Sequence, residues 1–410
     1  MSLKQKSTSL INNSFYLYIS YFSDYLMALF FLPFIARTVG TEEFGNIGIV
    51  QTLGIFFILL IEFGSTLTTT KNIARKRGNE KDMKKLLGEI LTSRLILVPI
   101  VFVFAIISIS LFAIFQSNSK YVLIVVIGSI LQGLSPNWYF QGVEKMKVLA
   151  LSKFFSRILG FIIIFFFVKS PENAWIVLAS YAFSNAMICI YLNFRMVTDL
   201  GTIKIATFTQ SIKILRQSLH GFIIAVIPAL YHNISVIVLS MYVNPYQLGL
   251  FYGANRVYRA FNSLFGPISQ AFFPILASAK NFEQKKMLIK KYFTIIFIIG
   301  SFFCATLFFF SEQITLLLLG DQFVSSAKIL KIFALVLPLT AISNTFGRQW
   351  LISLDKERRF SRTQFVSFFI SIISLKFLVN EWGVLALPVS LIVYEISSII
   401  LILLFVKRAR

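Results

Sequence analysis

The chain has 410 residues, of which 57% are hydrophobic and 14% charged, with a formal net charge of +22 and a mean hydropathy of +0.79. Because soluble globular proteins carry roughly 25% charged residues, this composition excludes a soluble fold and indicates an all-α, multi-pass membrane protein. Two Cys and two His exclude a disulfide framework and a Cys/His metal site, and we expect no metal and no cofactor.

The apolar runs predict twelve spans, because a helix that crosses the hydrocarbon core needs ~20 apolar residues. Short polar stretches separate the runs, and none of these stretches is long enough to fold as a separate domain. The only outer loop of any size is expected near 312–325. The spans are expected near residues 12–36, 47–69, 90–115, 121–141, 150–168, 174–194, 218–241, 248–277, 292–311, 326–347, 363–380 and 384–406.

The basic residues lie in alternate connections, and this distribution excludes nucleic-acid binding as the reason for the high charge. Lys and Arg concentrate in every second loop, whereas the intervening loops hold few. Such alternation is the positive-inside pattern of membrane proteins and places both termini in the cytoplasm. The basic stretches are the two termini and the loops near 71–85, 145–157, 195–216, 280–291 and 348–362.

A repeated motif indicates that one unit of half the length occurs twice. The stretch VGTEEFGNIG at 39–48 is echoed by VNPYQLGLFYG at 243–253, and WYFQGVEKMK at 138–147 by WLISLDKERR at 350–359. Two matches in the same order favour a duplication. Six spans per half give both halves the same orientation, so we expect two six-helix lobes, 1–205 and 206–410, related by a pseudo-twofold axis along the membrane normal. A central cavity between them would suit alternating access.

Several charged residues fall inside the predicted spans, where a charge at the helix centre costs ~2.5–3.5 kcal/mol. Asp24 and Arg256 lie deep in their spans, and each suits either a water-filled cavity or a structural ion pair between helices. Arg94 and Arg157 lie nearer to cytoplasmic ends, and we expect their side chains to extend to the membrane surface.

Short motifs resemble the polysaccharide transporter family, specifically O-antigen flippases of the Wzx type. The family belongs to a superfamily that also contains peptidoglycan-precursor flippases and multidrug exporters, and it implies 12 or 14 helices. The resemblance covers nearly the whole chain. It rests on ARTVGTEEFGNIGIVQTL at 36–53, EFGSTLTTTKNIAR at 62–75, LGLFYGANRVYRAF at 248–261, FFPILA at 272–277 and LLGDQFVSSAKIL at 318–330.

The resemblance implies a non-enzymatic flippase in the bacterial inner membrane. Its substrate would be a polyprenyl-pyrophosphate-linked oligosaccharide, the O-antigen repeat unit. Arg256 and Arg259 suit the pyrophosphate, because guanidinium groups pair bidentately with phosphate, and Asn255 and Tyr252 lie beside them on the same span. The implied partners are membrane lipid, a glycan polymerase and a chain-length regulator.

The resemblance also implies coupling to a gradient of H⁺ or Na⁺. A buried carboxylate that gains and loses a cation would serve this purpose. The candidates, in order, are Asp24, Glu62 and Glu395.

Three alternatives remain open at this stage. The first is a flippase for another lipid-linked glycan, such as a capsule unit, an enterobacterial common antigen unit or a peptidoglycan precursor. The second is an exporter of cationic drugs, which the paired Arg256 and Arg259 disfavour. The third is a membrane enzyme such as a glycan polymerase, which would need a larger loop outside the membrane.

Overall fold

The computed structural model describes residues 3–64, 69–70, 72–73, 75–76, 79–277, 281–354 and 356–407. Within these ranges the side chains of 3–15, 17–30, 220–221, 223–232, 267, 270–271, 273–274, 277, 357 and 406–407 are not described. The described residues are almost entirely helical and include no strand. The expectation of an all-α protein is confirmed for this part of the chain.

The chain divides into two compact units. Unit 1 comprises 1–31 and 46–233, and unit 2 comprises 32–45 and 234–410. The segment 32–45 thus belongs to unit 2 although the residues on both sides of it belong to unit 1. The lobes expected at 1–205 and 206–410, their pseudo-twofold axis and the cavity between them stay predictions.

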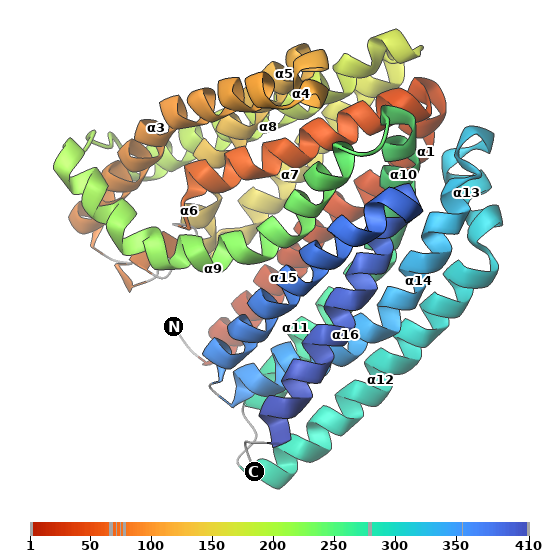
Figure 1. Cartoon of the computed structure of the whole chain (residues 1–410). Helices are drawn as coiled ribbons and strands as arrows, with labels where there is room; N and C mark the ends of the chain where they lie inside the picture. The colour runs from red at the N-terminus through yellow and green to blue at the C-terminus, as the bar shows by residue number, and fades with distance from the viewer. Residues whose placement is uncertain are drawn as a thin grey trace. The chain divides into compact units, whose positions relative to one another are not determined.

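Unit 1 is a bundle of long helices in which α3 packs on α5, α5 on α8, and α7 on α8 (Figure 1). Asn79 caps the start of α3, where its side chain accepts a hydrogen bond of 3.1 Å from the Asp82 amide. The elements are α1 (Leu3–Glu62, shared with unit 2), α3 (Glu80–Leu111), α4 (Ala113–Ser117), α5 (Ser119–Leu134), α6 (Asn137–Gly142), α7 (Met146–Phe167), η1 (Pro171–Asn173), α8 (Ala174–Leu200) and α9 (Phe208–Ser240, shared with unit 2).

In unit 2, α14 contacts α10, α12 and α16, and α15 packs along α16 (Figure 1). Asn244 and Asn281 cap α10 and α12 by accepting from the amides of Gln247 and Gln284, at 2.9 and 2.8 Å. The elements are α10 (Pro245–Ser263), α11 (Phe265–Ala277), α12 (Phe282–Phe309), α13 (Ser311–Leu319), η2 (Asp321–Phe323), α14 (Ser326–Ser343), the π-helix η3 (Asn344–Leu351), α15 (Glu357–Trp382), η4 (Gly383–Leu385) and α16 (Ala386–Lys407).

Eight helical stretches of the described residues are long and apolar enough to cross a membrane, so the chain is a multi-pass membrane protein. The count of twelve spans stays a prediction. Several expected spans are interrupted: 90–115 divides at Phe112 into α3 and α4, 121–141 at Ser135–Pro136 into α5 and α6, and 248–277 at Leu264 into α10 and α11. The connection expected near 312–325 contains α13 and η2, and its place outside the membrane stays a prediction.

The connection between the expected spans 12–36 and 47–69 is a break at one residue inside α1. Gly40 has φ 80° and ψ 170°, while the residues on both sides are helical. A positive φ is a conformation that L side chains adopt at a cost, so glycine suits this position. The part of α1 that follows Gly40 begins at Thr41, whereas the sequence predicts a span that begins near residue 47.

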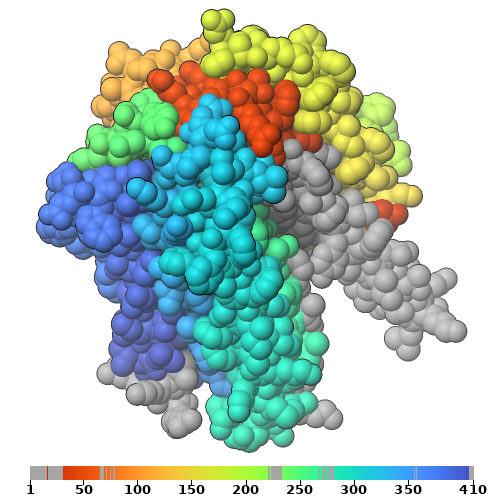
Figure 2. All heavy atoms as spheres, turned by 90° about the vertical axis from the view of Figure 1, so that its right-hand side faces the viewer, coloured from red at the N-terminus to blue at the C-terminus, as the bar shows by residue number. Residues whose placement is uncertain are grey.

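Large apolar side chains are exposed along the outer faces of several helices, as expected for contact with lipid. On α12 they include Ile298, Phe302 and Phe309, which are 61%, 66% and 73% exposed. Figure 2 shows α12 and α13, coloured teal to cyan, at the front of unit 2. The outer faces of α3 and α7 carry similar residues, such as Ile106 and Phe166.

Candidate functional site

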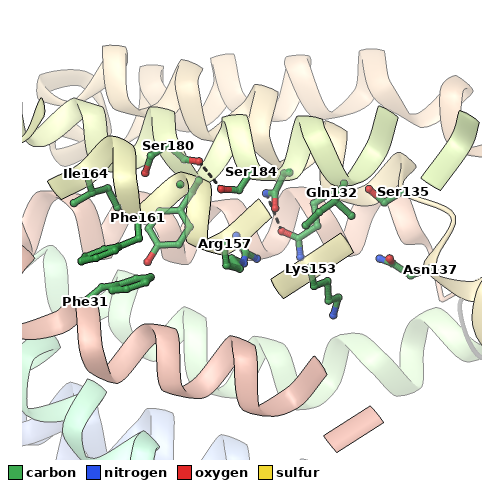
Figure 3. Close-up of a pocket in the computed structure, with 14 residues that line it drawn as sticks. Phe31, Gln132, Ser135, Asn137, Lys153, Arg157, Phe161, Ile164, Ser180 and Ser184 are labelled. Carbon is green, nitrogen blue, oxygen red and sulfur yellow. Dashed lines mark hydrogen bonds between the residues drawn. The ribbon is translucent and has the colours of Figure 1, made fainter. Parts of the chain in front are cut away.

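A cavity of about 350 Å³ lies within unit 1, lined by side chains of α5, α7 and α8, by Asn137 at the start of α6 and by Phe31 of α1. Figure 3 shows its labelled side chains, with Phe31 and Phe161 at one end and Asn137 at the other. The lining combines cations, amides, hydroxyls and aromatic rings. Among these lining residues none is acidic, so the cavity is suited to an anionic or neutral polar ligand.

Two cations on α7 define the middle of the cavity. Lys153 and Arg157 are four residues apart, so they project from the same face of the helix. The Arg157 guanidinium lies 5.7 Å from the ring centre of Tyr181, which also lines the cavity. Both cations are half-buried. Their charges are therefore screened less than charges at an exposed surface.

Amide and hydroxyl groups line the wall that α5 and α8 contribute. Asn185 Nδ2 donates to Gln132 Oε1 at 3.2 Å (Figure 3). It also donates to the Gly128 carbonyl at 3.2 Å. Ser184 donates to the Ser180 carbonyl at 2.9 Å. Such groups provide the hydrogen bonds that sugar hydroxyls need.

Asn137 adds a polar group at the start of α6. Its Oδ1 is buried, and no described residue donates a hydrogen bond to it. A buried acceptor of this kind costs free energy unless a water or a ligand satisfies it.

The other end of the cavity is aromatic. The rings of Phe31 and Phe161 stack at 3.7 Å between centroids, with an angle of 4° between their planes. Ile164 extends this apolar end. Aromatic faces pack against sugar rings and lipid chains alike, so the cavity can hold a ligand with a charged part and a less polar part.

The substrate residues predicted on α10 lie in unit 2 and do not line this cavity. Arg256 is half-buried and lies over the Phe44 ring, 4.8 Å from its centre. Arg259 is exposed, whereas Asn255 and Tyr252 are 9% and 6% exposed. Their role in substrate binding stays a prediction.

The three predicted carboxylates have different surroundings. The side chain of Asp24 lies outside the described residues. Glu62 is half-buried in unit 1, and its charge acts on Arg94. Glu395 is buried in unit 2, where Thr340 and Ser343 donate hydrogen bonds to it.

The expectation that Arg94 extends to the membrane surface is wrong. Its side chain is 1% exposed, donates to the Gly133 carbonyl and lies 5.4 Å from the ring centre of Trp138. A carbonyl at the end of α5 and the charge of Glu62 provide the partners that solvent would otherwise supply.

The cavity residues were not predicted as a site from the sequence. Arg157 was expected to extend to the surface, and Lys153 was counted only as part of a basic loop. One signal was available: two cations at i and i+4 precede Gly160 and Phe161 on the same face of a span. The contributions of α5 and α8 could be found only from the tertiary structure.

Residues 10–280 match the family described as polysaccharide biosynthesis protein. The chain belongs to this family. It is 27% identical to a "Putative O-antigen transporter" of Escherichia coli (strain K12), over 98% of this chain and 97% of that protein. A protein of the same description from Shigella dysenteriae is 27% identical, over 96% of this chain and 99% of its own length. The expected family is confirmed.

The fold resembles solved structures of transporters. An inward-facing multidrug resistance MATE family transporter of the MOP superfamily has a TM-score of 0.77 at 16% identity, covering 94% of this chain and 93% of that chain. The lipid II flippase MurJ in an inward closed conformation has a TM-score of 0.76 at 16% identity, covering 96% and 87%. At this identity, the similarity establishes the fold alone.

Proposed function

We propose that this family member is a flippase for a polyprenyl-pyrophosphate-linked oligosaccharide, the O-antigen repeat unit. It moves the headgroup from the cytoplasmic to the periplasmic leaflet of the bacterial inner membrane by alternating access, and it carries out no covalent chemistry. The names of the relatives and the fold shared with a lipid II flippase support this proposal.

The observation that carries the proposal is the cavity of unit 1. Lys153 and Arg157 would hold the pyrophosphate, because ammonium and guanidinium groups bind phosphate oxygens strongly where water is partly excluded. Gln132, Asn185 and Asn137 would bind sugar hydroxyls. The polyprenyl chain can stay in lipid throughout, so only the headgroup needs a polar path.

A flippase for another lipid-linked glycan would use the same pyrophosphate contacts, and only the sugar contacts would differ. An exporter of cationic drugs is disfavoured, since two cations and no acidic residue are found among the residues that line the cavity. We also propose coupling to a cation gradient, with Asp24, Glu62 and Glu395 as candidate carboxylates. Contacts with a glycan polymerase and a chain-length regulator stay predictions.

The test replaces both cavity cations. The Lys153→Ala/Arg157→Ala variant should lose at least tenfold in binding of a polyprenyl-pyrophosphate glycan to purified protein and in glycan export by cells. Lys153→Arg should retain most binding, because it keeps the charge. A glycan linked to the same polyprenol without phosphate should bind wild type and the double variant equally.

Lys169→Ala is the matched control. Lys169 lies just after the C-terminal end of α7, is exposed and does not line the cavity. Its side chain donates to the Phe165 carbonyl at 2.9 Å. Wild-type binding by a folded Lys153→Ala/Arg157→Ala variant would refute this cavity as the pyrophosphate site.

A further inference from the structure

Glu395 of α16 is a buried carboxylate in the membrane-spanning part of unit 2, and its side chain is 7% exposed. It accepts two hydrogen bonds from α14: Thr340 Oγ1 lies 3.1 Å from Oε1, and Ser343 Oγ lies 2.6 Å from Oε2. No described residue forms an ion pair with it. Two neutral hydroxyls compensate only part of the lost hydration of a carboxylate, so binding of a proton is favourable here.

The groups around Glu395 are mostly neutral. Tyr258 of α10 and Tyr394 of α16 are the titratable residues on which its charge acts, and Arg259 in turn acts on Tyr258. From α15, Gln364 accepts a hydrogen bond from Tyr394 Oη and donates to Ser398 at 2.9 Å. The described cations of the adjoining elements are exposed or engaged elsewhere. Arg256 lies over Phe44, Arg359 lies over Phe405, and Lys331 pairs with Glu312. The exposed ones are Arg259, Lys328, Arg348, Arg358, Arg362 and Lys376.

The two hydroxyls lie where α14 is irregular. Pro338 precedes Thr340 by two residues and removes one backbone hydrogen bond from the helix. Directly after Ser343 the chain continues as the π-helix η3, Asn344–Leu351. π-helical segments inside α-helices are rare and are frequently found at functional sites.

Protonation would change which groups donate at this position. The ionised carboxylate only accepts, so both hydroxyls turn toward it. A neutral acid carries a proton of its own and can donate to one hydroxyl oxygen. That hydroxyl is then free to donate to its own helix, and Ser343 Oγ already lies 3.3 Å from the Thr340 carbonyl. Hydroxyls that bond back to the helix bend it.

We propose that Glu395 is a proton-binding site whose occupancy selects between two backbone arrangements of α14 and η3. The step is a reversible transfer of one proton between water and the carboxylate. This inference rests on the proposed function only in assigning the bound proton to transport. No group of three His, Cys, Asp or Glu side chains that could hold a transition-metal ion occurs among the described residues.

The first measurement is the infrared difference spectrum of the purified full-length protein between high and low pH. Wild type should show the carbonyl stretch of a carboxylic acid, and Glu395→Gln should lose it. Glu312→Gln is the matched control, because Glu312 is exposed and pairs with Lys331 at 3.6 Å. That variant should keep the band. Ser343→Ala, which leaves the acid in place, should shift the frequency of the band.

The second measurement is hydrogen exchange of the amides in 338–351, corrected for the intrinsic effect of pH. Exchange in wild type and in Glu312→Gln should change at least fivefold between the two pH values, and exchange in Glu395→Gln should stay constant. The inference is overturned if the carboxylic-acid band is the same in wild type and Glu395→Gln. It is also overturned if amide exchange in 338–351 of wild type does not change with pH. A proton site with both properties, in a protein that moves no lipid-linked glycan, would instead refute the proposed function.

Discussion

Arg94 shows how a single charged side chain can be accommodated inside the bundle of unit 1. It is fully buried, and its partners are the Gly133 carbonyl, the face of Trp138 and the charge of Glu62. A charge at this depth is tolerated only with such partners, because the burial of a charged group without partners is strongly unfavourable. Arg94 is therefore a structural residue of α3 rather than a surface anchor.

This environment predicts a large loss of stability when the charge is removed. Arg94→Met should lower the thermal midpoint of the purified protein substantially, since it leaves the Gly133 carbonyl unsatisfied and Glu62 without its cation. The thermal midpoint of Arg94→Lys should lie between those of wild type and Arg94→Met, because lysine keeps the charge but lacks the planar guanidinium. A midpoint in Arg94→Met equal to that of wild type would contradict this assignment.

At the scale of elements, one glycine from each copy of the repeated motif meets the other within unit 2. Gly45 of α1 and Gly249 of α10 are equivalent in the repeat, and each lies at the fifth position of its helical stretch. A Cβ on Gly45 would lie 2.7 Å from the Gly249 nitrogen, and a Cβ on Gly249 would lie 2.7 Å from the carbonyl carbon of Thr41. Only residues without a side chain allow the two backbones to approach so closely.

Polar contacts hold the same segment, 32–45, in unit 2. Arg37 donates to the carbonyls of Leu316 and Leu317 at the end of α13, at 3.2 and 2.8 Å. Gln322 donates to the carbonyls of Ala36 and Arg37 at 3.0 and 3.1 Å. The segment is thus fixed both by the approach of two backbones and by four hydrogen bonds to backbone carbonyls.

We expect Gly249→Ala to lower the thermal midpoint, because the added methyl group meets backbone atoms of Thr41 that cannot move independently. Gly45→Ala should act in the same direction. Gly266→Ala is the matched control, because nothing lies within 4 Å of the added methyl group. Equal midpoints for Gly249→Ala and Gly266→Ala would show that the close approach is not maintained in the membrane protein.

At the scale of the whole molecule, the alternation of basic loops makes a prediction about topology. Reporter fusions after Gly201 or Lys285 should be found in the cytoplasm, and fusions after Asn244 should be found outside. The reason is that Lys and Arg near the ends of spans are retained on the cytoplasmic side. A cytoplasmic reporter after Asn244 would contradict the orientation and the parallel repeat together.

Particular residues show why the sequence predicted the spans better than the candidate site. The span expected from 248 begins slightly earlier in the structure, at Pro245, where Asn244 caps α10. The breaks at Ser135–Pro136 and Leu264 and the helix α13 were missed, because hydropathy alone does not distinguish a continuous helix from an interrupted one, or a short helix from a loop. The amide wall of the cavity was missed because Gln132 and Asn185 are 53 residues apart.

The sequence alone determined the class of the protein, the family and most of the helical stretches. These depend on composition, local hydrophobicity and short motifs, all of which act over a few tens of residues at most. The tertiary structure decided which charged residues are buried with partners, as Arg94 and Glu395 are, and which line a cavity, as Lys153 and Arg157 do. The physical reason is that the cost of a charge in a membrane depends on what surrounds it, and helices distant in the sequence supply those surroundings.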